Sequence, residues 1–313
     1  MRIAPAHPRR IRWLALTLGG VVALAAANTP SRATADPPGP EQVHDWAFAI
    51  GNRTLTGTAD AVGERYARFD LVVVDGEEAT AAKVAAMRSR GALALAYLSV
   101  GTIERWRGWY PQLKRYRLGA WRDWEDEWFA DTARAGLRRE IAGEIAPTLL
   151  AKGFDGLFLD NTDMVEVPRH RAQRAGMGRL ISRLDQVVGP DRLLFTQNGH
   201  RGMARGYPGQ GVPPLAPSFE GWNREDASWT WDFEDRRYRP VGARGREAAT
   251  AELEGMRGLG LLTTATDYVD LEDASSAAEC ASEARAREAG ALPYVANIGL
   301  TREAVFANPP DCP

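Results

Sequence analysis

Apolar positions in this chain form short runs that alternate with helical patterns from residue 43 onward. Short apolar runs bounded by glycine or polar residues are typical of buried parallel strands. The sequence predicts eight such strands, at residues 46–50, 69–74, 92–100, 157–159, 193–196, 215–219, 259–265 and 292–296. Because all eight are short and none reaches a helix-like length, a buried sheet is the expected core.

Helical patterns lie between these strands and after the last one. The predicted helices cover residues 61–68, 79–90, 131–151, 168–188, 244–257, 271–289 and 301–306. Asp131 is expected to cap the third of them, and Gly91, Gly153 and Gly290 each follow a helix as a C-terminal stop. Eight strands that alternate with helices favour a single (β/α)8 TIM barrel over an open doubly wound sheet.

The first 35 residues follow a different pattern. An arginine-rich start precedes the apolar stretch Trp13–Ala27, and Ala33-Thr34-Ala35 matches a small-residue cleavage signal. We therefore predict a signal peptide at 1–35, an extended proline-rich leader at 36–42 and one barrel domain at 43–313. The mature protein is expected to be secreted. A retained signal anchor is the alternative, and Sec or twin-arginine export both remain open.

Charge narrows the choice of partner. The chain has 39 basic and 41 acidic residues, and the signal segment holds five arginines and no acid. Its removal leaves 34 basic against 41 acidic residues and a net charge of −7. This balance argues against a nucleic-acid partner, which requires a basic face. A negative net charge suits a cationic ligand, or it serves only to keep the protein soluble. We expect a monomer without stable membrane insertion.

Cysteine and histidine usage limits the chemistry. The two cysteines, Cys280 and Cys312, are expected to form a disulfide after export, with two free thiols as the alternative. The histidines form no spaced metal motif, and the chain has no nucleophile elbow, phosphate loop or dinucleotide fingerprint. No metal or organic cofactor is therefore expected.

Polar side chains follow nearly every predicted strand. The set comprises Asp75, Ser99, Glu104, Asp160, Asn161, Asp163, Asn198, Glu220, Asp267 and Asn297. The carboxyl ends of barrel strands share one face, where such enzymes place their chemistry. Asp160 is the first candidate, because Phe158 and Leu159 precede it and can desolvate its carboxylate. Two carboxylates with separated pKa values are the minimum for glycoside hydrolysis.

Aromatic residues concentrate in two connections. They are Trp106, Trp109, Tyr110, Trp121, Trp124 and Trp128 after the third strand, and Trp222, Trp229 and Trp231 after Glu220. Exposed indoles offer flat apolar faces to sugar rings and can also face cations. We expect roughly half of these rings to pack onto the barrel instead, because aromatic side chains are usually well buried.

Several motifs occur in the order seen in a known family. They are Tyr97-Leu98-Ser99-Val100-Gly101 with Glu104, Gly153-Phe154-Asp155-Gly156 continuing to Asp160-Asn161-Thr162-Asp163, Asn198-Gly199, and Phe219-Glu220. With these motifs the chain resembles glycoside hydrolase family 114, whose members are endo-α-1,4-polygalactosaminidase-like TIM-barrel proteins. The resemblance implies a secreted hydrolase that acts inside an α-linked, galactosamine-rich polysaccharide.

The resemblance also implies roles for individual residues. Asp160 would be the nucleophile of a retaining mechanism and Glu220 the general acid/base, with exchanged roles or an inverting mechanism as alternatives. Glu225 is the alternative to Glu220, because the residues after Glu220 depart from the family's pattern. Substrate binding is expected from Asp75, Tyr97, Ser99, Glu104, Asn161, Asp163, Asn198, Trp222, Asp267 and Asn297. A non-catalytic carbohydrate-binding barrel and an α-glycosidase for a neutral glycan remain open.

Overall fold

The computed structural model describes residues 42–271, 276–301 and Cys312, all within a unit that spans Asp36–Pro313. The expected signal peptide at 1–35, most of the leader and most of the helix at 301–306 lie outside the described residues. Among the helices that are described, none combines the length and the apolar composition needed to cross a bilayer.

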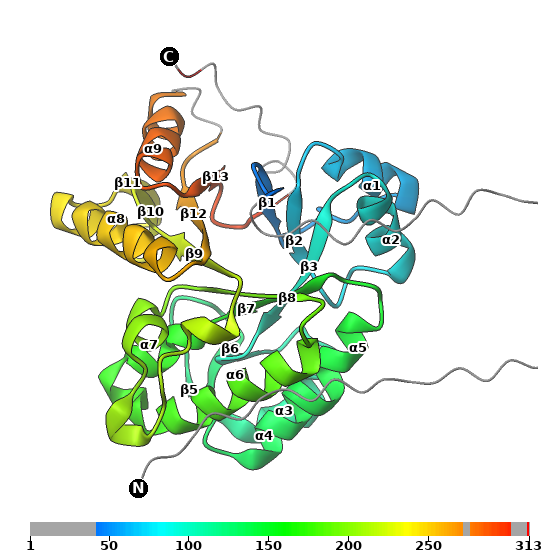
Figure 1. Ribbon diagram of the computed structural model, residues 1–313, viewed down its shortest axis with the longest axis vertical. Helices are drawn as coiled ribbons and strands as arrows, with labels where there is room; N and C mark the ends of the chain where they lie inside the picture. The colour runs from blue at the N-terminus through cyan, green and yellow to red at the C-terminus, as the bar shows by residue number, and fades with distance from the viewer. Residues whose placement is uncertain (1–41, 272–275, 302–311, 313) are drawn as a thin grey trace, which may run out of the picture. The chain divides into compact units, whose positions relative to one another are not determined.

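Eight parallel strands form the central sheet, as Figure 1 shows. In their order around the sheet they are β1 (Trp46–Ala49), β2 (Leu71–Asp75), β3 (Leu93–Ser99), β7 (Gly156–Asp160), β8 (Leu193–Gln197), β9 (Gly221–Glu225), β12 (Leu262–Tyr268) and β13 (Leu292–Ala296). Each neighbouring pair is parallel, and the sheet curls into a nearly closed barrel. The predicted (β/α)8 barrel is therefore confirmed.

Aromatic side chains fill part of the barrel interior. The rings of Phe48 in β1 and Phe158 in β7 lie 4.9 Å apart, and because β1 and β7 are not neighbouring strands this contact crosses the interior. The indole of Trp46 donates to the carbonyl of Leu292, 3.1 Å away, and so links β1 to β13. Each fully buried large side chain contributes about 1.5–3 kcal/mol of hydrophobic stabilisation.

Helices surround the strands. They are α1 (Ala59–Tyr66), α2 (Ala81–Ser89), α3 (Tyr110–Leu113), α4 (Ala135–Glu140), α5 (Ala146–Leu150), α6 (Arg174–Val188), α7 (His200–Arg205), α8 (Ala243–Gly258) and α9 (Ser276–Glu288). Thr58 and Thr80 cap α1 and α2 through their hydroxyl oxygens, as N-cap residues usually do. The predicted cap at Asp131 is wrong, because α4 begins four residues later with Arg134 at its N-cap. A π-helical stretch, Ile141–Ile145, joins α4 to α5.

Two connections at the carboxyl ends of barrel strands carry small sheets that the sequence did not predict. The connection after β3 contains β4 (Thr102–Glu104), β5 (Arg117–Ala120) and β6 (Glu127–Ala130), in the order β4-β6-β5. The connection after β9 contains the hairpin of β10 (Trp229–Asp232) and β11 (Arg237–Pro240). Both sheets hold tryptophans of the two aromatic segments.

The predicted sixth strand at 215–219 is wrong. Ala216–Ser218 forms a single 3-10 turn, and the sixth barrel strand is Gly221–Glu225. The shift matters for the site, because it moves Glu220 from the end of a strand to the position just before one. The predicted disulfide is confirmed: Cys280 of α9 is bonded to Cys312.

Candidate active site

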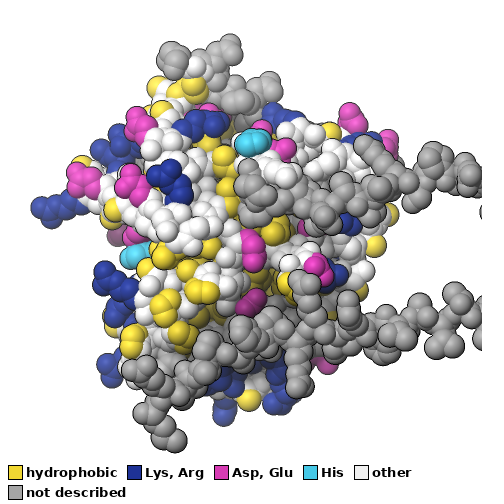
Figure 2. Space-filling model, viewed as in Figure 1, with side chains coloured by type: hydrophobic (Ala, Val, Ile, Leu, Met, Phe, Trp, Pro, Cys, Tyr) yellow, Lys and Arg dark blue, Asp and Glu magenta, His cyan; other side chains and the backbone are white. Residues whose placement is uncertain are grey.

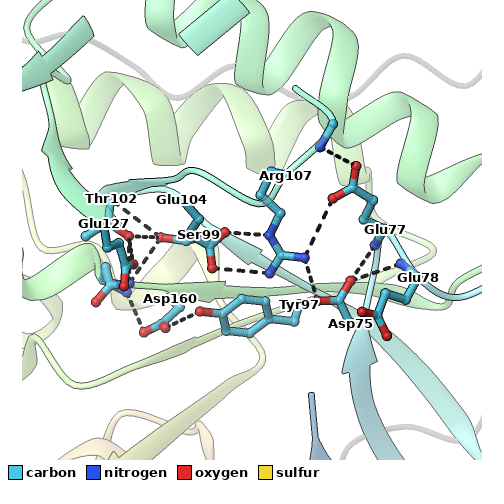
Figure 3. A network of polar contacts seen from close by, with 12 residues as sticks. Asp75, Glu77, Glu78, Tyr97, Ser99, Thr102, Glu104, Arg107, Glu127 and Asp160 are labelled. Carbon is cyan, nitrogen blue, oxygen red and sulfur yellow. Dashed lines mark hydrogen bonds and ion pairs between the residues drawn. The ribbon is translucent and has the colours of Figure 1, made fainter. Parts of the chain in front are cut away.

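Asp160 ends the fourth barrel strand and receives three hydrogen bonds. The Tyr97 hydroxyl donates to its Oδ2 at 2.5 Å, and the Gln197 amide and the Asn161 backbone N–H donate to Oδ1 at 2.5 and 2.6 Å. Figure 3 shows the Tyr97 ring pointing at this carboxylate. Burial raises the pKa of Asp160, and the three donors oppose that rise because they stabilise the charged form.

The turn after Asp160 is shaped by Asn161. Its backbone adopts the left-handed conformation (φ 60°), and its side-chain amide donates to the hydroxyl oxygens of Ser99 and Thr102 at 3.1 and 3.2 Å. The adjoining loop passes so close that a Cβ on Gly101 would lie 1.8 Å from the Asn161 carbonyl oxygen. Glycine at position 101 therefore allows the loops after β3 and β7 to meet beside Asp160.

Glu225 ends the sixth barrel strand, at the same face of the barrel as Asp160. The Asn198 amide donates to its Oε2 at 2.9 Å, and the Tyr268 hydroxyl donates to its Oε1. Burial is the main reason that its pKa is raised to about 8, and the negative charges of Asp160 and Asp226 add to the effect. Glu225 is therefore protonated at neutral pH, whereas Asp160 is surrounded by donors that favour its ionised form.

A chain of polar side chains runs from Asp160 into the barrel interior. Gln197 donates to Asp160 and accepts, at 3.2 Å, from the side chain of Asn223, which is fully buried in β9. Asn223 accepts in turn from the hydroxyls of Thr264 and Thr266, at 2.9 and 3.2 Å. Asp160 is thus tied to residues of strands β8, β9 and β12, whereas Glu225 has its own partners, Asn198 and Tyr268.

Glu220 does not join this group. Its Oε2 accepts from the backbone N–H of Leu194 at 2.7 Å, and its own N–H donates to the Leu194 carbonyl at 3.0 Å. Both residues lie at the amino ends of their strands, opposite the face that carries Asp160. The structure therefore does not bring together the predicted pair Asp160 and Glu220, and the end of the sixth strand is occupied by Glu225.

Asp75 and Glu104 form a buried network with Arg107 (Figure 3). Arg107 Nη1 lies 2.5 Å from Asp75 Oδ2, and Arg107 Nε lies 2.6 Å from Glu104 Oε2. Asp75 Oδ1 also accepts from the backbone N–H groups of Glu77 and Glu78. These contacts pair both carboxylates with one guanidinium and leave few of their oxygens for a sugar, which weakens the expectation that they bind substrate directly.

Glu127 is a buried carboxylate beside the site that the sequence did not indicate. It lies on β6, accepts from the Thr102 hydroxyl, and thereby connects to Ser99, whose Oγ lies 2.6 Å from Thr102 Oγ1. Burial first, and then the charge of Glu104, raises the pKa of Glu127 to about 8. No linear pattern marks this residue, because it approaches Asp160 only once the β4-β6-β5 sheet has formed.

The remaining predicted residues fall into different settings. Asp163 follows Asp160 in a 3-10 turn, and burial together with the charges of Asp160 and Glu166 raises its pKa to about 7. Asp267 accepts from the backbone N–H groups of Ser228 and Trp229, so it anchors the start of the β10–β11 hairpin.

Two further predicted residues, Asn297 and Trp222, differ in burial. Asn297 follows β13 and donates to the Thr301 hydroxyl at 2.9 Å. Trp222 is 0% exposed, and its indole donates to the Asn198 carbonyl. The prediction that Trp222 presents a face to the substrate is therefore wrong, since this ring belongs to the core.

Other aromatic side chains remain accessible around the mouth. Trp106 is 56% exposed, and the half-buried tryptophans are Trp109, Trp121, Trp124, Trp128, Trp229 and Trp231. Trp124, between β5 and β6, meets Phe233, between β10 and β11, edge to face at 5.4 Å. The two aromatic segments therefore touch each other, although they follow barrel strands three and six.

The geometry suits acid-assisted cleavage of an acetal. A carboxylate that accepts three hydrogen bonds at the end of the fourth strand, and one with a pKa raised to about 8 at the end of the sixth, could supply a nucleophile and a proton donor. Gln197, Asn198 and Tyr268, which the sequence did not single out as a group, orient the two carboxylates. The tripeptide Gln197-Asn198-Gly199 after the fifth strand was the available signal for the first two.

Comparison with solved structures shows the same fold in several carbohydrate enzymes. The glycoside hydrolase domain of PelA from Pseudomonas aeruginosa is 24% identical (TM-score 0.67), with 82% of this chain and 96% of that chain covered. Ega3 from Aspergillus fumigatus, solved in complex with galactosamine, is 14% identical (TM-score 0.61), with 88% and 98% covered. The α-galactosidase TtGalA from Thermus thermophilus is 16% identical (TM-score 0.55), with 85% and 66% covered. A search of curated proteins returned no match.

A family model adds a direct sequence match. It covers residues 25–202, which is more than half of the 313 residues and includes Asp160 with its partners Tyr97, Asn161 and Gln197. The motifs that suggested the resemblance and the TIM-barrel architecture agree with this match. The chain belongs to glycoside-hydrolase family GH114.

Proposed function

We propose that this glycoside hydrolase is exported and cleaves α-linked, galactosamine-rich polysaccharide within the chain, with retention of configuration. Asp160 is the nucleophile and Glu225 the general acid/base. The observation that carries the proposal is a pair of buried carboxylates at one barrel face with different hydrogen-bond partners. Asp160 accepts three hydrogen bonds, and the pKa of Glu225 is raised to about 8.

Each residue has a defined part in the reaction. Glu225 donates its proton to the glycosidic oxygen while Asp160 Oδ attacks the anomeric carbon, so the glycosidic bond breaks and a glycosyl ester forms. Glu225, now ionised, then removes a proton from water, which attacks the same carbon and releases Asp160. Two displacements at one carbon retain the configuration. Loss of the charge on Asp160 in the ester lowers the pKa of Glu225, because the repulsion between the two groups disappears.

Support for an amino-sugar substrate comes from two directions. The family resemblance is to polygalactosaminidase-like enzymes, and Ega3, which shares the fold, was solved with galactosamine. The site itself holds an excess of carboxylates, among them Asp160, Asp163, Glu127 and Glu225. The pKa values of Glu127 and Asp163 are raised to about 8 and 7, and a nearby ammonium group would favour their ionised forms, so these residues suit a substrate that carries ammonium groups.

The test is hydrolysis of three polymers: α-1,4-linked polygalactosamine, its fully N-acetylated form and a neutral α-galactan. We expect new reducing ends and a broad range of oligosaccharides from the first polymer, with the α-anomer formed first in NMR spectra. The Asp160→Asn variant, folded by circular dichroism, should release none. Preferential cleavage of the neutral galactan would contradict the substrate, and a β-anomer formed first would contradict the retaining mechanism.

A further inference from the structure

A basic pocket lies in the helical layer, outside the active-site network. Its volume is about 780 Å³, and its walls come from α4, α6 and the segment 210–218. Four arginines line it: Arg138 and Arg139 from α4, and Arg179 and Arg183 from α6. Figure 2 shows Lys and Arg side chains gathered at the lower edge of the view, where Figure 1 places α4 and α6.

The positive charges in this pocket are not balanced within the described part of the chain. No Asp or Glu lines the pocket, and the side chains of Arg139, Arg179 and Arg183 make no hydrogen bond or ion pair with any described residue. Arg138 donates through Nη1 to the carbonyls of Thr132 and Ala133, at 2.6 and 2.8 Å. These carbonyl contacts hold the guanidinium in place but bring no opposite charge.

Mutual repulsion among the arginines is visible at Arg138. Its pKa is lowered, first by burial and then by the charges of Arg179, Arg139 and Arg183, and Asp131 acts in the opposite direction from outside the lining. Arg179 and Arg183 are also one helical turn apart, a spacing at which like charges destabilise a helix by about 0.2–0.5 kcal/mol. A bound anion would relieve this repulsion, whereas folding alone does not.

The opposite wall of the pocket is apolar and closely packed. Val212, Pro213, Pro214 and Leu215 form part of it, and α6 approaches this segment at Gly178. A Cβ at position 178 would lie 2.6 Å from Val212 Cγ1, so a larger residue would push the wall away. The volume is within the range of small-molecule sites and exceeds that of a single oxyanion. The shape therefore suits a ligand larger than one phosphate ion.

We propose that this pocket binds clustered phosphate groups, with Arg139, Arg179 and Arg183 as the contacting residues. A guanidinium presents parallel N–H donors that match two phosphate oxygens, and the arginine charges together suit a multiply charged group. Soluble phosphorylated compounds and the headgroups of an anionic lipid surface share this chemistry. The site is independent of the hydrolytic reaction, because none of its lining residues belongs to the network around Asp160 and Glu225.

Titration calorimetry with inorganic tripolyphosphate tests the proposal on the whole protein. The double variant Arg179→Ala/Arg183→Ala removes two pocket charges. Arg201→Ala/Arg205→Ala on α7 is the matched control, with the same spacing, exposed side chains and charge change outside the pocket. We expect one site per chain, at least about tenfold weaker binding in the pocket variant and less than about twofold change in the control. Absence of binding to the unaltered protein, or equal weakening in both variants, would overturn the proposal.

Two further arms distinguish the source of the phosphate. A lipid surface is assigned if the protein co-sediments with phosphatidylglycerol vesicles but not with phosphatidylcholine vesicles, and if tripolyphosphate competes with this co-sedimentation. Tripolyphosphate binding without vesicle association assigns a soluble ligand. Both double variants should hydrolyse polymer at the unaltered rate, so failure of phosphate binding leaves the proposed hydrolytic function untouched. Hydrolysis lost in the pocket variant alone would contradict the independence of the two sites.

Discussion

The two ends of strand β9 each carry a glutamate, and the two glutamates have different surroundings. Glu220, just before the strand, accepts from a backbone N–H of the neighbouring strand. Glu225, the last residue of the strand, accepts from the side chains of Asn198 and Tyr268 and has a pKa raised to about 8. A carboxylate next to a barrel strand therefore indicates chemistry only when the direction of the strand is known.

The amino ends of the barrel strands use carboxylates in a repeated structural way. Asp155, just before β7, accepts from the N–H of Ala94 at 2.9 Å and donates its own N–H to the Ala94 carbonyl, also at 2.9 Å. Glu220 forms the same reciprocal pair with Leu194, and Asp70, just before β2, forms it with Asp45. Each acid ties the start of its strand to the start of a neighbour, which is a role in stability.

The carboxyl ends differ because their acids accept mainly from side chains. Asp160 is oriented by Tyr97 and Gln197, and Glu225 by Asn198 and Tyr268. Side-chain donors leave the strand ladder intact and direct the carboxylates into a shared space. In the proposed mechanism one end of the barrel carries catalysis and the other holds the strands together, and each role can be tested separately.

The largest expected effect is at the two ends of β7. Asp160→Gly should lower kcat by about 10⁴–10⁶-fold, because it removes the nucleophile. Added azide should restore turnover of a galactosaminide with a good leaving group and give a product of inverted configuration, identified by NMR. Asp155→Asn, at the amino end of the same strand, is the control. It should keep kcat within about twofold and lower the Tm, because it weakens the contacts to Ala94 and Arg88.

Equal losses of kcat in the Asp160 and Asp155 variants would contradict the separation of roles between the two strand ends. If azide does not restore turnover of the Asp160→Gly variant, Asp160 is not the nucleophile. That result would not affect the separation of roles between the two strand ends.

A smaller effect is expected at Tyr268, in the pH profile of kcat/KM. Activity should fall above about pH 8, because Glu225 then loses the proton that it donates. It should also fall at acid pH as Asp160 becomes protonated. The Tyr268 hydroxyl stabilises the ionised form of Glu225, so Tyr268→Phe should move the basic limb to higher pH and lower kcat by about tenfold.

The matched control for Tyr268 is Tyr207→Phe, which removes a hydroxyl that contacts Glu166 rather than Glu225. Its basic limb should stay in place. A basic limb that moves to lower pH in Tyr268→Phe, or that moves equally in both variants, would mean that Glu225 is not the group that sets it.

Much of the barrel was predictable because its strands are continuous apolar runs. The run Leu71-Val72-Val73-Val74, for example, is buried throughout. Strand β9, Gly221-Trp222-Asn223-Arg224-Glu225, was missed because its inward position is the amide of Asn223 rather than an apolar side chain. That amide forms hydrogen bonds with Gln197, Thr264 and Thr266 on neighbouring strands. Partners on other strands cannot be predicted from the pattern of residues along one segment.

The site was predictable to a similar extent. Asp160 follows an apolar strand directly, and Tyr97 lies within another, so their alignment at one face followed from the fold class alone. Glu127, Arg107 and Tyr268 depend on tertiary contacts made by small sheets and by neighbouring strands. The placement of Glu220 at a carboxyl end was wrong because the predicted strand, 215–219, precedes Glu220, whereas the observed strand, Gly221–Glu225, follows it.

The central claim, that Glu225 and not Glu220 is the acid/base, is tested most directly by kcat for two matched variants on polygalactosamine. Glu225→Gln cannot donate a proton and should lower kcat by about 10²–10⁴-fold. Glu220→Gln keeps an acceptor for the Leu194 N–H and should hold kcat within about threefold. Normal turnover in Glu225→Gln together with a large loss in Glu220→Gln, both variants being folded, would contradict the account.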